Sequence, residues 1–320
     1  MSSNSNVGIA LAAVSSLPFA AYIMPRKLCK LRVVEYQFWL GFAVVPVCLL
    51  AVLFAGAPFA GSRDALLYSF VCGPIWVLGS LSYSSAVDRI GVARSTPVKN
   101  FAPAFASLYG IVLFGEYTIR DLRSLGFAVG GLLLMTVAAW ILGRASAPEH
   151  ETATAFSPNL SESDRRKALR WGFLFSLSAA FFYGLYAAPL KVAVAREGLD
   201  PFTACLYLGL GVLAAGIVVY WVRERRLYPP TPSRRDFVLS QMAGALWAPA
   251  QILGTLAMVH VAMSISWPTS NLSTLIAIAW GVFVFKEVHL EKHKGELVLS
   301  VLCYAAGVTM LVFAAPHGRV

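Results

Sequence analysis

Apolar residues occur in long runs along the chain, and short polar or turn-rich stretches separate these runs. Ten of the runs are about as long as the roughly 20 residues that an α-helix needs to cross a bilayer. They lie at residues 8–26, 34–55, 66–87, 95–115, 124–143, 171–190, 202–222, 237–260, 266–285 and 296–315. The pattern therefore predicts an all-α membrane protein with ten transmembrane helices.

One polar segment is much longer than the others. Residues 144–170 are rich in Ser, Glu, Ala and Arg, and they divide the chain into nearly equal halves. A segment of this composition buries too little apolar surface to form a span, so it is typical of a linker. We expect residues 1–143 and 171–320 to form two five-helix units on either side of it.

The two halves share sequence at fixed offsets. At an offset of 164, Tyr22, Pro25 and Lys27 align with Tyr186, Pro189 and Lys191, so Y-x-x-P-x-K ends the first run of each half. At an offset of 171, Gly73, Trp76, Ser95, Pro97, Asn100, Gly110 and Glu116 align with Gly244, Trp247, Ser266, Pro268, Asn271, Gly281 and Glu287.

This internal repeat has a consequence for orientation. Because five is an odd number of spans, the second unit must enter the membrane in the opposite sense to the first. Two inverted repeats are typical of secondary transporters that work by alternating access, since exchanging the conformations of the units exposes a central site to each side in turn. Duplication kept only for packing is the structural alternative.

Composition and charge agree with a protein of the bilayer. The 320 residues are 58% hydrophobic and 13% charged, with a mean hydropathy of +0.68, which is too apolar for an ordinary soluble domain. The net charge of +10 does not indicate a nucleic-acid-binding protein, because Lys and Arg lie in loops between the runs. By the positive-inside rule these loops and the linker face the cytoplasm, and both termini face outward.

Aromatic and polar residues that share helical faces, or that match between the repeats, are the candidates for binding a solute. They are Tyr22, Trp76, Lys99, Asn100, Tyr186, Trp247, Gln251 and Asn271. Aromatic rings with a polar edge, together with amides, suit a polar solute with apolar faces, such as a sugar. Interfacial aromatic belts are the alternative, and for Tyr83 and Trp267 the belt fits as well as the site does.

Lys99 breaks the repeat, because Ser270 occupies the matched position. An ammonium inside a span usually faces a cavity and has a partner. It could bind an anionic group or a hydroxyl of the solute, or it could snorkel to the interface. Both interpretations stay open from the sequence.

Other chemistry is not indicated. No Asp or Glu lies clearly in the middle of a span, and the chain has no nucleophile–base pair, phosphate loop or metal-ligand spacing. We expect neither an enzyme, nor a cofactor, nor a metal site. The expected partners are a small-molecule solute and the lipid bilayer, without nucleic acid; a coupling cation is compatible with the sequence, and the oligomeric state is not indicated.

Several motifs resemble those of the drug/metabolite transporter superfamily. They are I-G-V-A-R-S-T-P at Ile90 to Pro97, L-F-G-E at Leu113 to Glu116, and V-F-K-E at Val284 to Glu287. The Y-x-x-P-x-K ending of the first span and the W-x-x-G pattern that begins at Trp76 are most similar to the glucose/ribose porter family. The resemblance covers essentially the whole chain. It implies a multi-pass protein of the plasma membrane, the inner membrane in a bacterium, that takes up a sugar or polyol.

Two further functions stay open at this point. Lys99 is also similar to the lysines of triose-phosphate and nucleotide-sugar translocators, which would imply an exporter or exchanger of amino acids or anionic metabolites. A membrane receptor that binds a ligand without moving it is the alternative from a different functional class.

The predicted orientation can be tested with an epitope tag at the C-terminus. We expect an external protease to remove this tag from intact cells, because the positive-inside rule places the C-terminus outside. A tag in the linker should be cleaved only after the membrane is opened. A C-terminal tag that stays protected in intact cells would contradict the orientation.

Overall fold

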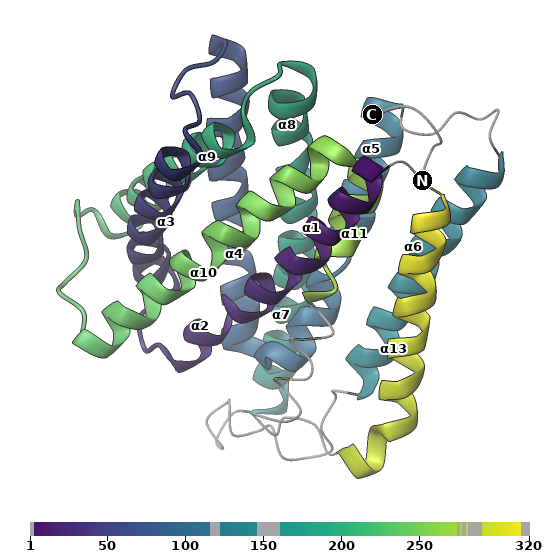
Figure 1. The fold of residues 1–320 in the computed structure, drawn as a ribbon. Helices are drawn as coiled ribbons and strands as arrows, with labels where there is room; N and C mark the ends of the chain where they lie inside the picture. Colours follow the sequence, from purple (N-terminus) through teal and green to yellow (C-terminus); the bar gives the residue numbers. More distant parts are fainter. Residues whose placement is uncertain are drawn as a thin grey trace.

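The computed structural model describes residues 3–115, 122–145, 161–273, 276, 280 and 290–314. The named elements of this part of the chain are all helices, and most are long and steeply inclined to one another (Figure 1). They are α1 (Ser3–Ala21), α2 (Met24–Leu28), α3 (Val33–Ala55), α4 (Arg63–Lys99), α5 (Ala102–Phe114), α6 (Leu122–Ala145), α7 (Glu162–Leu185), α8 (Ala187–Lys191), the π-helix η2 (Val192–Arg196), α9 (Pro201–Glu224), α10 (Arg234–His260), α11 (Met263–Ser270) and α13 (Leu290–Phe313).

The prediction of an all-α membrane protein is confirmed. Six helical segments are long and apolar enough to cross a membrane by length and composition: Ser5–Leu28, Val33–Ala55, Arg63–Gly91, Glu162–Arg196, Pro201–Glu224 and Arg234–His260. Each of the ten predicted spans falls on described helical residues. The span at 266–285 lies partly outside the described residues, as does most of the predicted linker.

The repeated Y-x-x-P-x-K motif interrupts a helix in both halves. α1 ends at Ala21, and α2 starts after Tyr22 and Ile23 with Pro25 in its first turn. In the second half, α7 ends at Leu185 and α8 follows directly after Tyr186. Proline is tolerated in a first turn because its missing N–H would have no partner there. The first span of each half is therefore broken, where the hydropathy pattern predicts a continuous helix.

The fourth predicted span is also broken. α4 bends at Gly91, whose φ of +77° is one that residues with a Cβ rarely adopt, and then continues to Lys99. α5 begins only at Ala102, after Asn100 caps α4. Ser95 to Lys99 therefore belong to α4 and are separated from the rest of the predicted span by two residues.

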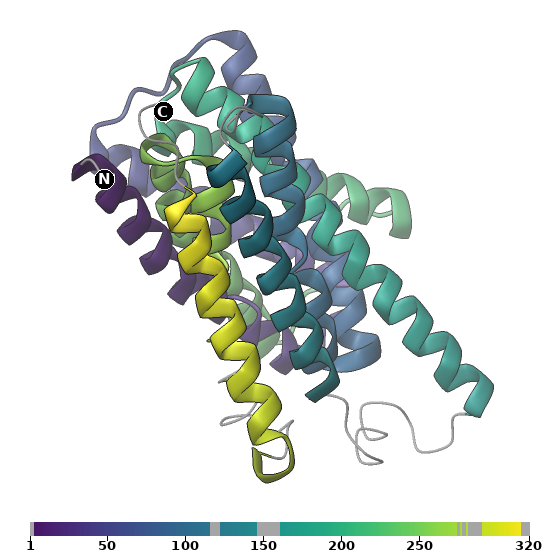
Figure 2. The same ribbon diagram turned by 90° about the vertical axis from the view of Figure 1, so that its right-hand side faces the viewer.

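Helices of the two halves pack against each other throughout the bundle. α1 packs along α10, and α4 packs along α7. α3 crosses α9, and α6 lies beside α13 at one edge of the bundle (Figures 1 and 2). α1 begins and α13 ends on the same side of the molecule (Figure 1). The main hydrophobic core is accordingly built from both halves.

Glycines allow two of these helix pairs to cross at short distance. A Cβ on Gly73 of α4 would collide with the backbone of Gly211 and Val212 in α9. A Cβ on Gly244 of α10 would lie 2.5 Å from the carbonyl oxygen of Leu40 in α3. Backbone atoms cannot rotate away as side chains do, so these two glycines determine how closely the helices approach.

Ion pairs gather at the end of the bundle that we call the basic end, formed by residues 26–32, 88–91 and 224–236. Arg26 is only 4% exposed and binds Asp88 at 2.6 Å. Arg32 binds Glu35 of its own helix and Glu224 at the end of α9. These groups come from three loops that the charge pattern predicts on one side of the membrane, and the structure brings them together.

The two crossing glycines can be tested by adding a single methyl group. We expect Gly73→Ala and Gly244→Ala each to lower stability by about 1–3 kcal/mol, because the added Cβ meets backbone atoms. Gly126→Ala in α6 is the matched control, since its Cβ would meet nothing within 4 Å. The measurement is the melting temperature of the purified protein in detergent. Equal melting temperatures for all three variants would contradict the close crossings.

Candidate functional site

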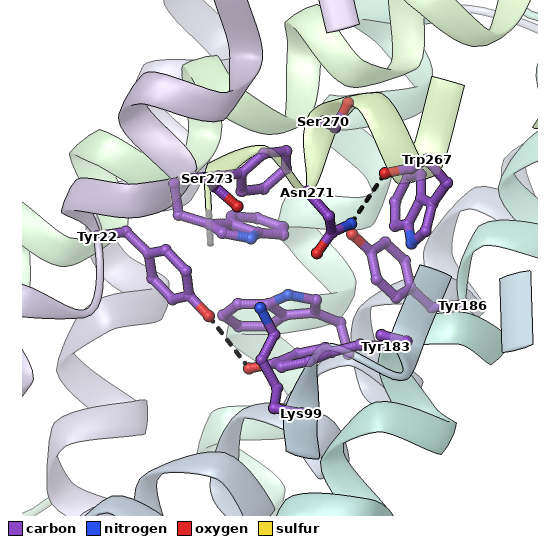
Figure 3. A pocket seen from close by; sticks show the side chains of 12 residues that line it. Tyr22, Lys99, Tyr183, Tyr186, Trp267, Ser270, Asn271 and Ser273 are labelled. Atoms are coloured by element: carbon purple, nitrogen blue, oxygen red, sulfur yellow. Dashed lines mark hydrogen bonds between the residues drawn. The ribbon is translucent and has the colours of Figure 1, made fainter. Parts of the chain in front are cut away.

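A cavity lies between the two halves and is lined by α1, α4, α5, α7, α10, α11 and the helix breaks next to them (Figure 3). Its lining residues are Phe19, Tyr22, Trp76, Lys99, Ala102, Tyr183, Tyr186, Trp247, Trp267, Ser270, Asn271 and Ser273. Six of these side chains are aromatic besides Phe19, and one is charged.

Most of the lining residues correspond to one another at the two sequence offsets. Phe19 with Tyr183 and Tyr22 with Tyr186 are 164 residues apart. Trp76 with Trp247, Lys99 with Ser270, and Ala102 with Ser273 are 171 residues apart. The cavity is therefore the place where equivalent positions of the two halves meet.

Two buried tryptophans form the centre of the aromatic wall. The rings of Trp76 and Trp247 lie 4.2 Å apart between centroids and are tilted by 41°. Tyr186 meets Trp267 edge-on at 5.2 Å. The indole N–H of Trp247 is buried and has no hydrogen-bond acceptor among the described residues. A buried donor of this kind needs a partner, which a water molecule or a polar solute can supply.

Hydrogen bonds hold the tyrosines of the cavity in place. The hydroxyl oxygens of Tyr22 and Tyr183 are 3.4 Å apart (Figure 3). Tyr186 donates to Oε1 of Gln251 at 2.8 Å, and Nε2 of Gln251 donates to Thr255 at 3.1 Å. Gln251 is fully buried and does not line the cavity, so it orients Tyr186 from behind.

Lys99 is the last residue of α4, and its side chain extends into the cavity (Figure 3). Its Nζ lies 5.6 Å from the ring centroid of Tyr83 and 5.9 Å from that of Tyr183. Within the described part of the chain, no carboxylate forms an ion pair with it. A cation–π contact contributes about 0.5–2 kcal/mol, whereas removing an ion from water costs several kcal/mol. The charge of Lys99 is therefore only partly compensated.

Two asparagines end the helices on either side of the cavity. Asn100 caps α4 with φ −75° and ψ 5°, and Asn271 caps α11 with φ −80° and ψ 4°. Nδ2 of Asn271 donates to the carbonyl of Trp267 at 2.9 Å, and its side-chain oxygen faces the cavity (Figure 3). The side chain of Asn100 is buried outside the lining, and its amide has no partner among the described residues.

The structure brings six of the eight predicted site residues to one cavity, and it places Gln251 and Asn100 behind the wall. The six are Tyr22, Trp76, Lys99, Tyr186, Trp247 and Asn271. Whether they bind a solute stays a prediction. The sequence analysis did not include Phe19 and Tyr183, although both are aromatic and match at the offset of 164, so the repeat contains the signal that identifies them.

Trp267 and Tyr83, for which the sequence left an interfacial belt open, are both buried. Trp267 is 4% exposed and lines the cavity. Tyr83 is 2% exposed, and its hydroxyl is 2.7 Å from that of Thr96. Belt residues face lipid headgroups, so the belt interpretation does not apply to these two.

Comparisons with known proteins point to uptake of sugars. The family model described as sugar transport protein matches residues 35–314. The putative ribose uptake protein RbsU of Latilactobacillus sakei is 20% identical over 279 residues, which cover 85% of this chain and 87% of that protein. The glucose uptake protein GlcU of Bacillus subtilis is 21% identical over 256 residues, 79% of this chain and 78% of its own.

The fold also matches a solved structure. One crystal structure superposes with a TM-score of 0.68 over 97% of this chain and 98% of the other, at 14% sequence identity. At this identity the likeness shows the fold alone.

The uncompensated charge of Lys99 predicts an unusual stability effect. We expect Lys99→Met to raise the melting temperature of the solute-free protein by a few degrees, because it removes a buried ammonium that lacks a counter-charge. Lys167→Met in α7 is the control, since that side chain is 73% exposed and should leave the melting temperature unchanged. A clear fall for Lys99→Met would mean that the ammonium is well compensated in the empty cavity.

Proposed function

The chain belongs to the sugar transport protein family, and from this premise we propose that it is a secondary carrier that moves a sugar or polyol by alternating access. Membership makes the chain a sugar transporter and not an enzyme, as the sequence predicts. The expected location, a multi-pass protein of the plasma (bacterial inner) membrane, agrees with the apolar helices and with the bacterial origin of these relatives.

The observation that carries the proposal is the aromatic cavity shared by both halves. A sugar ring has flat C–H faces and a rim of hydroxyl groups, so it needs apolar rings for its faces and hydrogen-bonding groups for its rim. Trp76 and Trp247 supply large ring surfaces, and the free indole N–H of Trp247 and the amide oxygen of Asn271 supply polar contacts. The cavity contains both kinds of surface.

The helix pairing supports two inverted five-helix repeats, residues 1–143 and 171–320. Exchanging each helix for its counterpart turns the pair α1–α10 into α7–α4, and both pairs are packed in the structure. The same exchange relates α3–α10 to α9–α4, and α1–α11 to α7–α5. A two-fold axis between the halves accounts for all of these pairings.

Single contacts support the same axis. A Cβ on Gly8 would lie 2.9 Å from the side chain of Val261, and a Cβ on Gly172 would collide with the side chain of Ile90. Gly8 and Gly172 are 164 residues apart, and Ile90 and Val261 are 171 residues apart. The same close contact is therefore made twice, once in each half.

Alternating access requires that each end of the bundle can close over the cavity. At the basic end, Arg26 follows Tyr22 by one helical turn and binds Asp88 of α4 with both carboxylate oxygens, at 2.7 and 2.6 Å. This pair closes the basic end next to the cavity. Breaking it would open a path from Tyr22 to the cytoplasm, and the matched repeats would give the opposite state a similar energy.

The other functions have less support. An exchanger of amino acids would need a counter-charge for an ammonium group, and no Asp or Glu lies among the lining residues. For the same reason a coupling cation would have to bind outside this lining. A receptor would bind the same solute without moving it, which an uptake measurement distinguishes.

The cavity can be tested by uptake into proteoliposomes with a panel of labelled sugars, polyols and sugar acids. We expect Trp76→Ala and Asn271→Ala to lower uptake of the carried compound at least tenfold, because each removes a lining side chain. Gln251→Ala should also lower it, since Tyr186 loses its hydrogen-bond partner. Trp221→Ala is the control, as this indole is 47% exposed on α9.

Unchanged uptake in all three cavity variants would remove the proposed site. Binding of a panel member without any uptake by the reconstituted protein would favour the receptor over the carrier.

A further inference from the structure

The two sides of the cavity differ in chemistry although their backbones correspond. One side presents the ammonium of Lys99, and the opposite side presents Ser270, Asn271 and Ser273 (Figure 3). At the offset of 171, Lys99 corresponds to Ser270, and Ala102 corresponds to Ser273. One side is therefore cationic and the other carries neutral hydrogen-bonding groups, with the aromatic rings between them. A solute that fits both sides is itself charged at one end and hydroxylated at the other.

The ammonium of Lys99 has no counter-charge in the part of the chain that the structure describes. Two tyrosine rings face it, but a ring offers only a partial negative charge on its face. The protein treats its buried arginine differently: Arg26, at 4% exposure, is paired with Asp88 and also donates to a backbone carbonyl. A buried cation left beside a cavity, in a chain that pairs a comparable one, indicates that the ligand brings the anion.

We propose that Lys99 binds a carboxylate of the solute, so that the transported sugar is a sugar acid, an aldonate or a uronate, and not a neutral sugar. This inference rests on the proposed function, because it assumes that the cavity binds the transported compound. The carboxylate lies on the α4 side against Lys99, and the hydroxyl groups lie toward Ser270, Asn271 and Ser273.

The number of charges favours a carboxylate over a phosphate. Lys99 is the one basic side chain among the lining residues. A phosphate monoester carries about −1.5 to −2 charges near pH 7, so one ammonium would leave close to one charge unbalanced in a cavity closed to water. A carboxylate carries a single charge and is balanced by Lys99 alone.

The test is uptake into proteoliposomes of labelled glucose, gluconate, glucuronate and glucose 6-phosphate at equal concentrations. The full-length protein is compared with Lys99→Met, Lys99→Arg and the exposed control Lys167→Met. We expect the wild type to take up a sugar acid at least tenfold faster than glucose. Lys99→Met should lose at least tenfold of this uptake, Lys99→Arg should keep part of it because the charge remains, and Lys167→Met should equal the wild type.

Other outcomes overturn the proposal in recognisable ways. Glucose uptake as fast as that of the acids, and insensitive to Lys99→Met, would overturn it while leaving the proposed sugar carrier intact. Faster uptake of glucose 6-phosphate than of either acid would overturn the single-charge argument. Uptake of no labelled compound would overturn the proposed function as well. If Lys99→Met does not fold, the preference of the wild type between glucose and the acids still decides.

Discussion

A helix that breaks inside the apolar layer of a membrane must find partners for the backbone groups that the break releases. The breaks beside the cavity satisfy this constraint with short-range turns. The N–H of Tyr22 donates to the carbonyl of Pro18, and that of Asn100 donates to the carbonyl of Thr96. The N–H of Asn271 donates to the carbonyls of Trp267 and Pro268. Because these turns are satisfied locally, the side chains at the breaks are free to face a cavity.

The breaks would not form one site without the close packing of the two halves. Gly73 and Gly244 let α4 and α10 approach the helices of the other half, and those two helices carry Trp76 and Trp247. The tryptophan rings meet at 4.2 Å where the halves join. A scaffold with matched contacts on both sides is suited to exchange between two states, while the unmatched residues in its cavity can select the solute. Lys99 is the charged member of that unmatched set.

Much of this protein could be predicted from its sequence because the relevant signals are local or linear. Span length follows from apolar runs, since the bilayer thickness sets how many residues a helix needs. The offsets of 164 and 171 identified Tyr22, Trp76 and their counterparts, because equivalent positions of a repeat fall at equivalent places in space. The break at Tyr22 was hidden, since Pro25 lies in an otherwise apolar run and hydropathy does not register a turn.

Tertiary structure alone decided which of the candidate side chains face the cavity. Gln251 and Asn100 are as polar as Asn271, yet they lie behind the wall, because neighbouring helices from distant parts of the chain determine which face is covered. The same packing buries Trp267 and Tyr83, which from sequence could equally have faced lipid headgroups. It also separates Lys99 from the described carboxylates while pairing Arg26 with Asp88. Such placements depend on contacts between residues far apart in the chain, and local sequence carries no record of those contacts.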